Sequence, residues 1–330
     1  ETLNLTYQMA GVSWQPVYDA RLDTSANELS LEQYGQVRQQ TGEDWSDIAL
    51  TFSTIRPAMG SEMPPISEWR VGIFNNQIFE SRANFAGQAA KMAMDSVAAP
   101  MAAPALQEVQ AEQQVAAVVA TEYAAEFKVP GRVDIKSTTD ATKLYISAAK
   151  LKATLSAKVT PRLDAHAYLF VETVNNQTYP IIPGSVSKYR DGAFVGNASL
   201  PLVRPEEKTN LSFGTDDRIK VEYKRIKDDE SNPALMVVGD MTVERQYETR
   251  LQNLHKNDLP ITIYEQFPVS ANADVKSELL PATTTAGFVK DSENRQGVIA
   301  WDVVLKPKEE KTYTLGFKVK YPKGERINGL

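Results

Sequence analysis

The stretch Gln39-Gln40-Thr41-Gly42-Glu43-Asp44-Trp45 decides how the chain folds, because it separates two runs of alternating apolar residues. Gly42 can adopt a positive φ without steric cost, and the Asp44 side chain is suited to bonding its own backbone two residues on. Trp45 then adds a large apolar ring just before the next alternating run. The pattern predicts a tight structural corner that the Trp45 ring anchors in the core.

The same corner also allows a functional interpretation. Glu43 and Asp44 are two carboxylates of the kind used as acid and base, as cation ligands or as contacts to a bound molecule. Adjacent residues of an extended segment point to opposite faces, so the two converge only if the backbone bends between them. We therefore interpret Gly42, Glu43, Asp44 and Trp45 as a structural corner, with ligand contact as the alternative, and we assign no catalytic residue.

Composition limits the class of protein. The chain has 330 residues, 42% of them hydrophobic and 24% charged, and a formal net charge of −6. This is typical of a globular protein, and the absence of a Lys/Arg-rich run argues against nucleic acid as a partner. No cysteine is present, which excludes disulfides and thiolate metal sites. No apolar run reaches the roughly 20 residues of a membrane span, and we expect an upstream segment, with any signal peptide, to have been removed before Glu1.

Period-two alternation predicts strands over most of residues 1–82, and Pro16 places its strand at an edge or at a break in pairing. Residues 83–122 form an insertion rich in Ala, Met and Gln that we expect to be partly helical or disordered, with one helix at 105–120. A surface tether is the simple interpretation of this insertion. The alternatives are a partner-binding helix and self-association through the insertion.

Strand patterns resume after the insertion, so we predict an all-β fold with two domains. Residues 1–226 form a β-rich domain interrupted by the insertion, and the charged, turn-forming cluster at 228–233 marks the boundary. Residues 227–330 form an immunoglobulin-like β-sandwich. Within it, the run 301–305 and the strong alternation of 313–321 predict a hairpin with a charged tip.

Catalytic and metal-binding signatures are absent from the sequence. His166 and His255 lack a second ligand at helical or strand spacing, and we expect His255 in a solvated turn. The acidic clusters 216–217 and 228–230 lack the spacing of a calcium loop, so we predict charged loop tips and assign no metal and no cofactor. Aromatic residues are candidates for stacking on sugar rings, although core packing is the commoner fate: Trp14, Tyr18, Tyr34 and Trp69.

Several motifs agree in order and spacing with a known bacterial family. They are Val12-Ser13-Trp14-Gln15-Pro16-Val17-Tyr18-Asp19-Ala20-Arg21, Gln40-Thr41-Gly42-Glu43-Asp44-Trp45, Leu50-Thr51-Phe52-Ser53-Thr54, Ile182-Pro183-Gly184, Phe194-Val195-Gly196, Phe267-Pro268-Val269-Ser270 and Tyr321-Pro322-Lys323. On these residues the chain resembles the mucoidy inhibitor A family over nearly its whole length. The resemblance implies a β-rich periplasmic or secreted protein, linked to exopolysaccharide control, with no catalytic residues to carry over.

Together these patterns favour a non-enzymatic cell-envelope or secreted module for binding and assembly. An envelope protein or a polysaccharide is the expected partner, and nucleic acid is not. The alternative is a polysaccharide-binding or polysaccharide-active protein that uses the corner from Gly42 to Trp45 and nearby aromatic residues.

Overall fold

The computed structural model describes residues 3, 5–54, 117–120, 125–231, 240–325 and 327–328. Over these residues the fold is all-β, as predicted, and the only helical turns are the short 3-10 segments η1 (Pro281–Thr283) and η2 (Ser292–Asn294). Most of the insertion 83–122, together with Trp69, lies outside the described residues.

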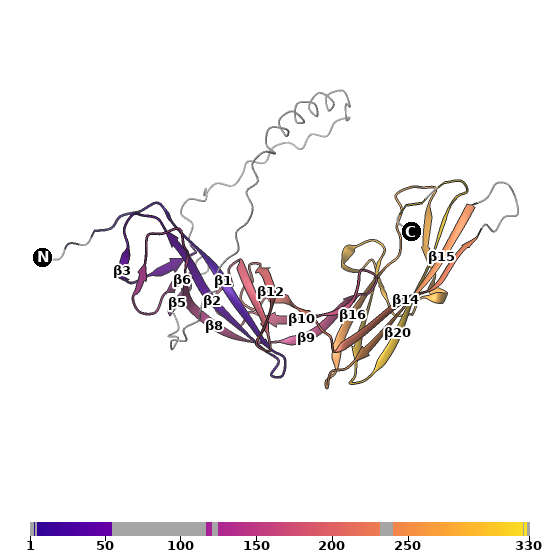
Figure 1. The fold of residues 1–330 in the computed structure, drawn as a ribbon, viewed down its shortest axis with the longest axis horizontal. Coiled ribbons are helices and arrows are strands. Elements are labelled where there is room, and N and C mark those ends of the chain that lie inside the picture. Colours follow the sequence, from indigo (N-terminus) through magenta and orange to yellow (C-terminus); the bar gives the residue numbers. More distant parts are fainter. Residues whose placement is uncertain are drawn as a thin grey trace, which may run out of the picture. The chain divides into compact units, whose positions relative to one another are not determined.

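A five-stranded sheet carries the N-terminal part of the chain, and Figure 1 shows β1, β2 and β8 running side by side. Its strands, in spatial order, are β12 (Ala193–Leu200), β11 (Gly184–Arg190), β1 (Val12–Asp23), β2 (Glu28–Gln39) and β8 (Thr142–Lys152). β11 pairs with β1 in parallel, and only from Val17 onward. Pro16 therefore lies where β1 has β2 as its one described neighbour, which agrees with the predicted break in pairing.

Two further sheets form a sandwich. The six-stranded sheet runs β13 (Lys208–Thr215), β10 (Asp164–Val174), β9 (Thr154–Thr160), β16 (Leu259–Gln266), β19 (Val298–Leu305) and β18 (Val289–Lys290). The four-stranded sheet runs β14 (Ile219–Ser231), β15 (Asp240–Asn253), β20 (Glu310–Pro322) and β17 (Lys276–Leu279). Inward side chains of both sheets, such as Ile263 and Phe317, share one buried core.

Two small sheets use strands from both sides of residues 55–116. β3 (Trp45–Ile48) pairs with β7 (Val133–Ile135), and β6 (Ala125–Lys128) lies between β4 (Thr51–Ser53) and β5 (Ala117–Ala120). The β3–β7 and β4–β6 ladders pair strands that precede residue 55 with strands that follow residue 116. β5 also corrects the predicted helix 105–120 at its last four residues, where β-branched Val118 and Val119 favour a strand.

The predicted hairpin between 301–305 and 313–321 is wrong. β19 pairs with β16 and β18, whereas β20 pairs with β15 and β17, so the connection crosses from one sheet of the sandwich to the other. Asn253 holds this crossover, because its backbone bonds both Lys308 and Glu309 and its side-chain amide donates to the Leu305 carbonyl oxygen. Both strands alternate because both face the same core, not because they pair.

The predicted domain boundary at 226/227 falls inside β14, and residues 228–231 extend that strand instead of forming a turn. Pairing with Arg245 stabilises the extension, since the Asp228 carboxylate accepts from the Arg245 guanidinium at 2.8 Å. Parallel pairing of β9 with β16 also joins strands from either side of the boundary in one sheet. The division into two domains stays a prediction.

Candidate functional site

The corner that follows β2 is organised by Gln39, whose side chain is fully buried. Its amide Nε2 donates to the carbonyl oxygens of Glu43 (2.9 Å) and Ile135 (3.0 Å), while its Oε1 accepts from the backbone N–H and the hydroxyl of Thr41. One side chain thus serves four hydrogen-bonding groups of the corner and of β7. Sequence reasoning included Gln39 in the decisive stretch but did not identify this role.

The predicted corner residues hold the turn against the loop after β7. Gly42 has a φ of 88° and its N–H donates to the Ser137 hydroxyl, while the Asp44 carboxylate accepts from the Ser137 N–H at 2.8 Å. Trp45 pairs with Ile135 and packs, partly buried, against the neighbouring core. The Glu43 side chain is exposed. These contacts describe a structural link, and ligand contact by the same residues stays a prediction.

The aromatic candidates separate into two environments. Tyr18 is 2% exposed and its hydroxyl donates to the Ile182 carbonyl oxygen. Trp14 packs against Phe52 with ring centroids 4.7 Å apart, in a space that Gly35 provides, since a Cβ there would lie 2.2 Å from the Phe52 ring. Tyr34 points to the opposite face of the sheet. Two of the aromatic candidates are therefore structural, and Tyr34 belongs to an accessible surface.

The histidines and acidic clusters are engaged in pairs. His255 is not a free solvated residue, because its Nε2 lies 2.8 Å from Oδ2 of Asp216, a carboxylate only 6% exposed. Burial opposes ionisation of Asp216, but the hydrogen bond and charge of His255 outweigh it and lower the pKa of Asp216. His166 pairs with Asp164. In the part of the chain that the structure describes, no group of three or more His, Asp or Glu side chains is arranged to hold a metal ion.

A second surface lies on the outer face of the five-stranded sheet. Because side chains alternate across a strand, Asp19 and Arg21 of β1 share this face with Glu32 and Tyr34 of β2, and the register places Asp19 directly opposite Glu32. Their neighbours on this face complete what we call the aromatic-ionic row: Asp19, Arg21, Glu32, Tyr34, Lys143, Tyr145, Tyr189 and Phe194.

Charges of the row neutralise one another. Arg21 lies 3.4 Å from the Glu32 carboxylate and 3.9 Å from that of Asp19, and the Lys143 ammonium lies 3.1 Å from Asp19. The Tyr34 hydroxyl donates to Glu32 at 2.9 Å. Burial, followed by this hydrogen bond, raises the pKa of Tyr34. Each carboxylate of the row is therefore held by a cation, which fixes the geometry of the surface.

Aromatic rings extend along the row. Tyr34 and Tyr145 meet edge to face at 5.7 Å, and Tyr189 and Phe194 do so at 5.5 Å. The Arg21 guanidinium lies 4.4 Å from the Tyr189 ring centre, and the Lys143 ammonium lies 3.9 Å from that of Tyr34. Phe194 is 56% exposed. The row thus presents aromatic edges and faces beside polar groups on a sheet surface.

A signal for this row was present in the sequence. The alternation that places Trp14, Pro16 and Tyr18 on the inner face necessarily places Asp19 and Arg21 on the other. The positions of Lys143, Tyr189 and Phe194 beside them come from strand order, which the sequence pattern does not encode.

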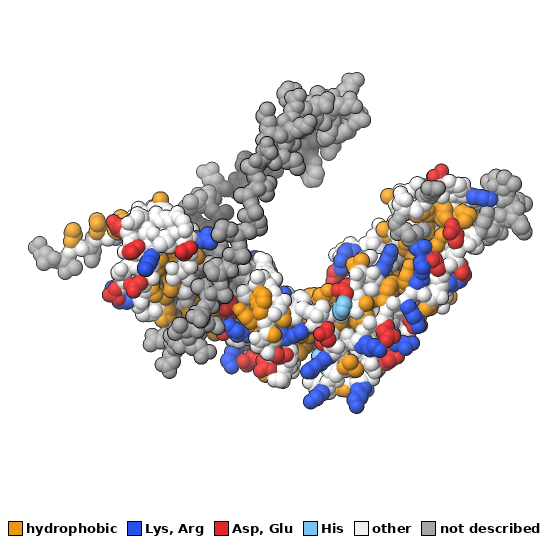
Figure 2. All heavy atoms as spheres, viewed as in Figure 1, with side chains coloured by type: hydrophobic (Ala, Val, Ile, Leu, Met, Phe, Trp, Pro, Cys, Tyr) orange, Lys and Arg blue, Asp and Glu red, His pale blue; other side chains and the backbone are white. Residues whose placement is uncertain are grey.

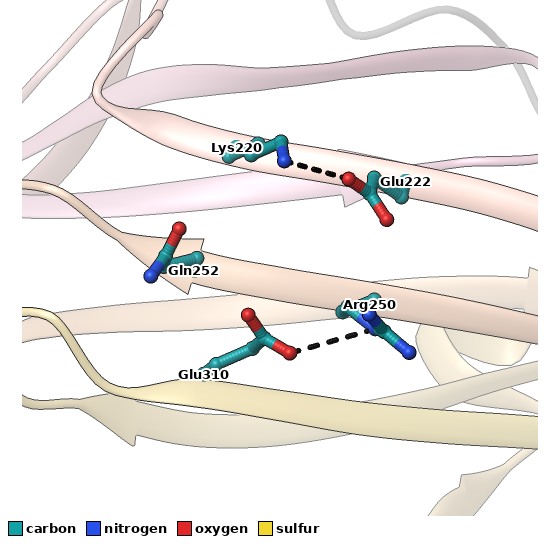
Figure 3. A pocket seen from close by; sticks show the side chains of 5 residues that line it. All are labelled: Lys220, Glu222, Arg250, Gln252 and Glu310. Atoms are coloured by element: carbon teal, nitrogen blue, oxygen red, sulfur yellow. Dashed lines mark ion pairs between the residues drawn. The ribbon is translucent and has the colours of Figure 1, made fainter.

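The four-stranded sheet offers a different surface, where Figure 2 shows Lys/Arg and Asp/Glu side chains intermingled over the region of β14, β15 and β20. A depression of about 50 Å³ there is lined by Lys220, Glu222, Arg250, Gln252 and Glu310. Figure 3 shows these side chains on three neighbouring strands, with Lys220 paired to Glu222 and Arg250 to Glu310. The depression is too small for more than a solvent molecule or two, and its charges are already paired.

The fold and these surfaces define an all-β protein with a partly exposed aromatic and ionic sheet face, on which Phe194 is exposed and Asp19 is buried. Its sequence matches the family described as "Domain of unknown function (DUF4139)" over residues 3–323, and the chain belongs to that family. It is also similar to Protein F37C4.5 of Caenorhabditis elegans, with 29% identity over 339 residues that cover 98% of this chain and 61% of that protein. The chain therefore spans less than two thirds of this relative. The finer resemblance to the mucoidy inhibitor A family stays a prediction.

Within the described residues, no helix has the length and apolar character of a membrane span.

Proposed function

We propose that this chain is a non-enzymatic binding module that holds a carbohydrate chain against the aromatic-ionic row. The observation that carries the proposal is the combination of partly exposed rings with paired charges on one sheet face. Aromatic rings stack on the apolar faces of sugars, and carboxylate, guanidinium and ammonium groups exchange hydrogen bonds with sugar hydroxyls. A sheet face with this chemistry suits an extended, hydroxyl-rich ligand.

A binding role without catalysis is supported by how the row holds its carboxylates. Asp19 and Glu32 each contact Arg21, and further contacts to Lys143 and the Tyr34 hydroxyl keep them in place. Carboxylates held in such pairs serve as fixed hydrogen-bond acceptors for a ligand. Turnover of any bound glycan by the purified chain would contradict this part of the proposal.

The test is binding of the chain to a panel of immobilised linear hexasaccharides, neutral and acidic. Phe194→Ala and Tyr145→Ala remove one ring from each end of the row, and each should weaken binding roughly tenfold, about 1.4 kcal/mol. Val289→Ala is the matched control, because Val289 is also 56% exposed but lies on β18 of another sheet. Failure of every hexasaccharide to bind, or equal losses in the control, would refute the carbohydrate role.

A location in the periplasm or the secreted fraction completes the proposal. Its support is the sequence resemblance described above, and cell fractionation of the native protein tests it. Recovery of the protein only from the cytosol would refute the envelope location and would leave the binding role to be judged by the binding assay.

A further inference from the structure

A groove of about 440 Å³ lies at the end of β1 and β2, next to the corner, and is lined by Gly11, Val12, Ser13, Arg38, Gln40 and Thr139. Its volume lies in the range of ligand sites. The lining comes from the start of β1, the end of β2 and the loop before β8. Gly11 extends the pairing of β1 with β2, because its carbonyl oxygen accepts from the Gln40 N–H at 2.9 Å.

Arg38 is the charged group of this groove, and its guanidinium is exposed without an ion-pair or hydrogen-bond partner among the described residues. The side chains of Ser13, Gln40 and Thr139 likewise have no partner there. Arg38 differs in this respect from Arg21 on the same face, whose guanidinium forms ion pairs with two carboxylates. A guanidinium presents a planar fork of donors that matches a carboxylate, and the flanking hydroxyl and amide groups supply further donors.

Ser13 and Arg38 of the groove share a sheet face with the aromatic-ionic row. Ser13 lies opposite Arg38, Gln15 opposite Gln36, and Val17 opposite Tyr34. Between the groove and the row, the Gln15 amide donates to Gln36 at 2.9 Å. Arg38 and Tyr34 are four residues apart on β2, or about 14 Å at 3.4 Å per residue. A ligand that reaches both is therefore an extended chain.

Charge favours an anionic ligand on this face. Among the described residues, the row and groove carry three cations, Arg21, Lys143 and Arg38, and two carboxylates, Asp19 and Glu32. Both carboxylates are paired with the first two cations, so the surplus positive charge is that of Arg38. Unlike a peptide, an acidic sugar chain supplies carboxylates together with the hydroxyls that the polar lining and the rings of the row are suited to bind.

We propose that Arg38 forms an anion subsite that selects carbohydrate chains bearing carboxylates. This inference rests on the proposed carbohydrate role and specifies the ligand as acidic. The carboxylate lies against the Arg38 guanidinium, with the Ser13 and Thr139 hydroxyls beside it, while neighbouring sugar units follow β2 toward Tyr34 and Tyr145. Such a pair weakens as salt screens it.

The experiment compares hexagalacturonate with its fully methyl-esterified form by calorimetry on the intact chain. The two ligands share length and hydroxyls, and the ester replaces each carboxylate charge by a neutral methyl ester. We expect the acid to bind about tenfold more tightly than the ester, and Arg38→Gln to remove that difference. Arg38 is exposed and has no ion-pair or hydrogen-bond partner among the described residues, so the variant should fold. Arg204→Gln, an exposed arginine on the loop before β13, is the matched control and should leave the preference intact.

Other outcomes would refute the anion subsite, the carbohydrate role or the choice of a sugar ligand. Equal binding of acid and ester, both weakened by Phe194→Ala, would keep the carbohydrate role and refute the anion subsite. Binding of neither would refute the carbohydrate role and the subsite with it. Tighter binding of hexaglutamate than of hexagalacturonate, with the same dependence on Arg38, would replace the sugar ligand by an acidic peptide.

Discussion

Glu265 in the sandwich core provides the sharpest test of the structure. It follows Leu259, Ile261 and Ile263 on the inward side of β16 and is 2% exposed. One carboxyl oxygen accepts from the Thr249 hydroxyl at 2.8 Å, and the other is buried without a partner among the described residues. Burial raises the pKa of Glu265 from 4.5 to about 7, although Thr249 and the charge of Arg162 oppose the rise.

The raised pKa converts into a dependence of stability on pH. A carboxyl group with a higher pKa in the folded state binds its proton more tightly there, so its contribution is fully present below pH 4.5 and is lost as pH rises to about 7. At about 1.36 kcal/mol per pH unit, the loss is about 3 kcal/mol. Tyr223 shares this interior, with a buried hydroxyl that also has no partner among the described residues. Burial, followed by the charge of Glu265, raises the pKa of Tyr223.

Glu265→Gln removes the ionisation while keeping the shape of the side chain. Urea unfolding followed by tryptophan fluorescence should show that the variant gains about 3 kcal/mol relative to the native chain between pH 4.5 and pH 8. Glu222→Gln is the control, because Glu222 is an exposed residue of β14 whose pKa is lowered by its hydrogen bond to Lys220. Its pH dependence between pH 5 and pH 8 should match that of the native chain. A constant difference between Glu265→Gln and the native chain across this window would refute the reasoning.

Three further substitutions test the packing around the corner by urea unfolding. Gln39→Ala should cost about 2–4 kcal/mol, because it leaves the buried Ile135 carbonyl and two partly buried backbone groups of the corner without their partner; a loss below 1 kcal/mol would contradict the role of Gln39. Trp45→Ala should cost about 2–3 kcal/mol, less than for a fully buried ring since Trp45 is only partly buried, and unchanged unfolding would show that the ring is no anchor. Gly35→Ala should cost about 1–3 kcal/mol through its clash with Phe52, and Phe52→Leu in the same chain should recover part of that loss; no recovery would point to another cause.

Local patterns in the sequence determined the fold class and the strands, because alternation of apolar and polar residues depends only on neighbours along the chain. β1, β2 and β20 lie where alternation predicts them, and Gly42 takes the positive φ expected of a corner. The sequence also specified the face of each strand, so the separation of Tyr18 from Asp19 followed from periodicity alone.

The tertiary structure decided which strands become neighbours. Period two is the same whether two strands pair in one sheet or face each other across a core, so 301–305 and 313–321 resembled a hairpin although β19 and β20 lie in different sheets. The charged residues 228–231 resembled a turn until pairing with β15 made them a strand.

The candidate site could be predicted only in part, because the sequence pattern does not say which strands are neighbours. Asp19 and Arg21 were visible on one face of their strand, but their contacts with Lys143 and Tyr189 arise because β2 pairs with β8 and β11 joins β1 in parallel. These partners are more than a hundred residues away along the chain, and the burial that brings them together belongs to the whole core. Composition and periodicity therefore determined the elements of this protein, whereas long-range hydrophobic packing decided which of their side chains meet.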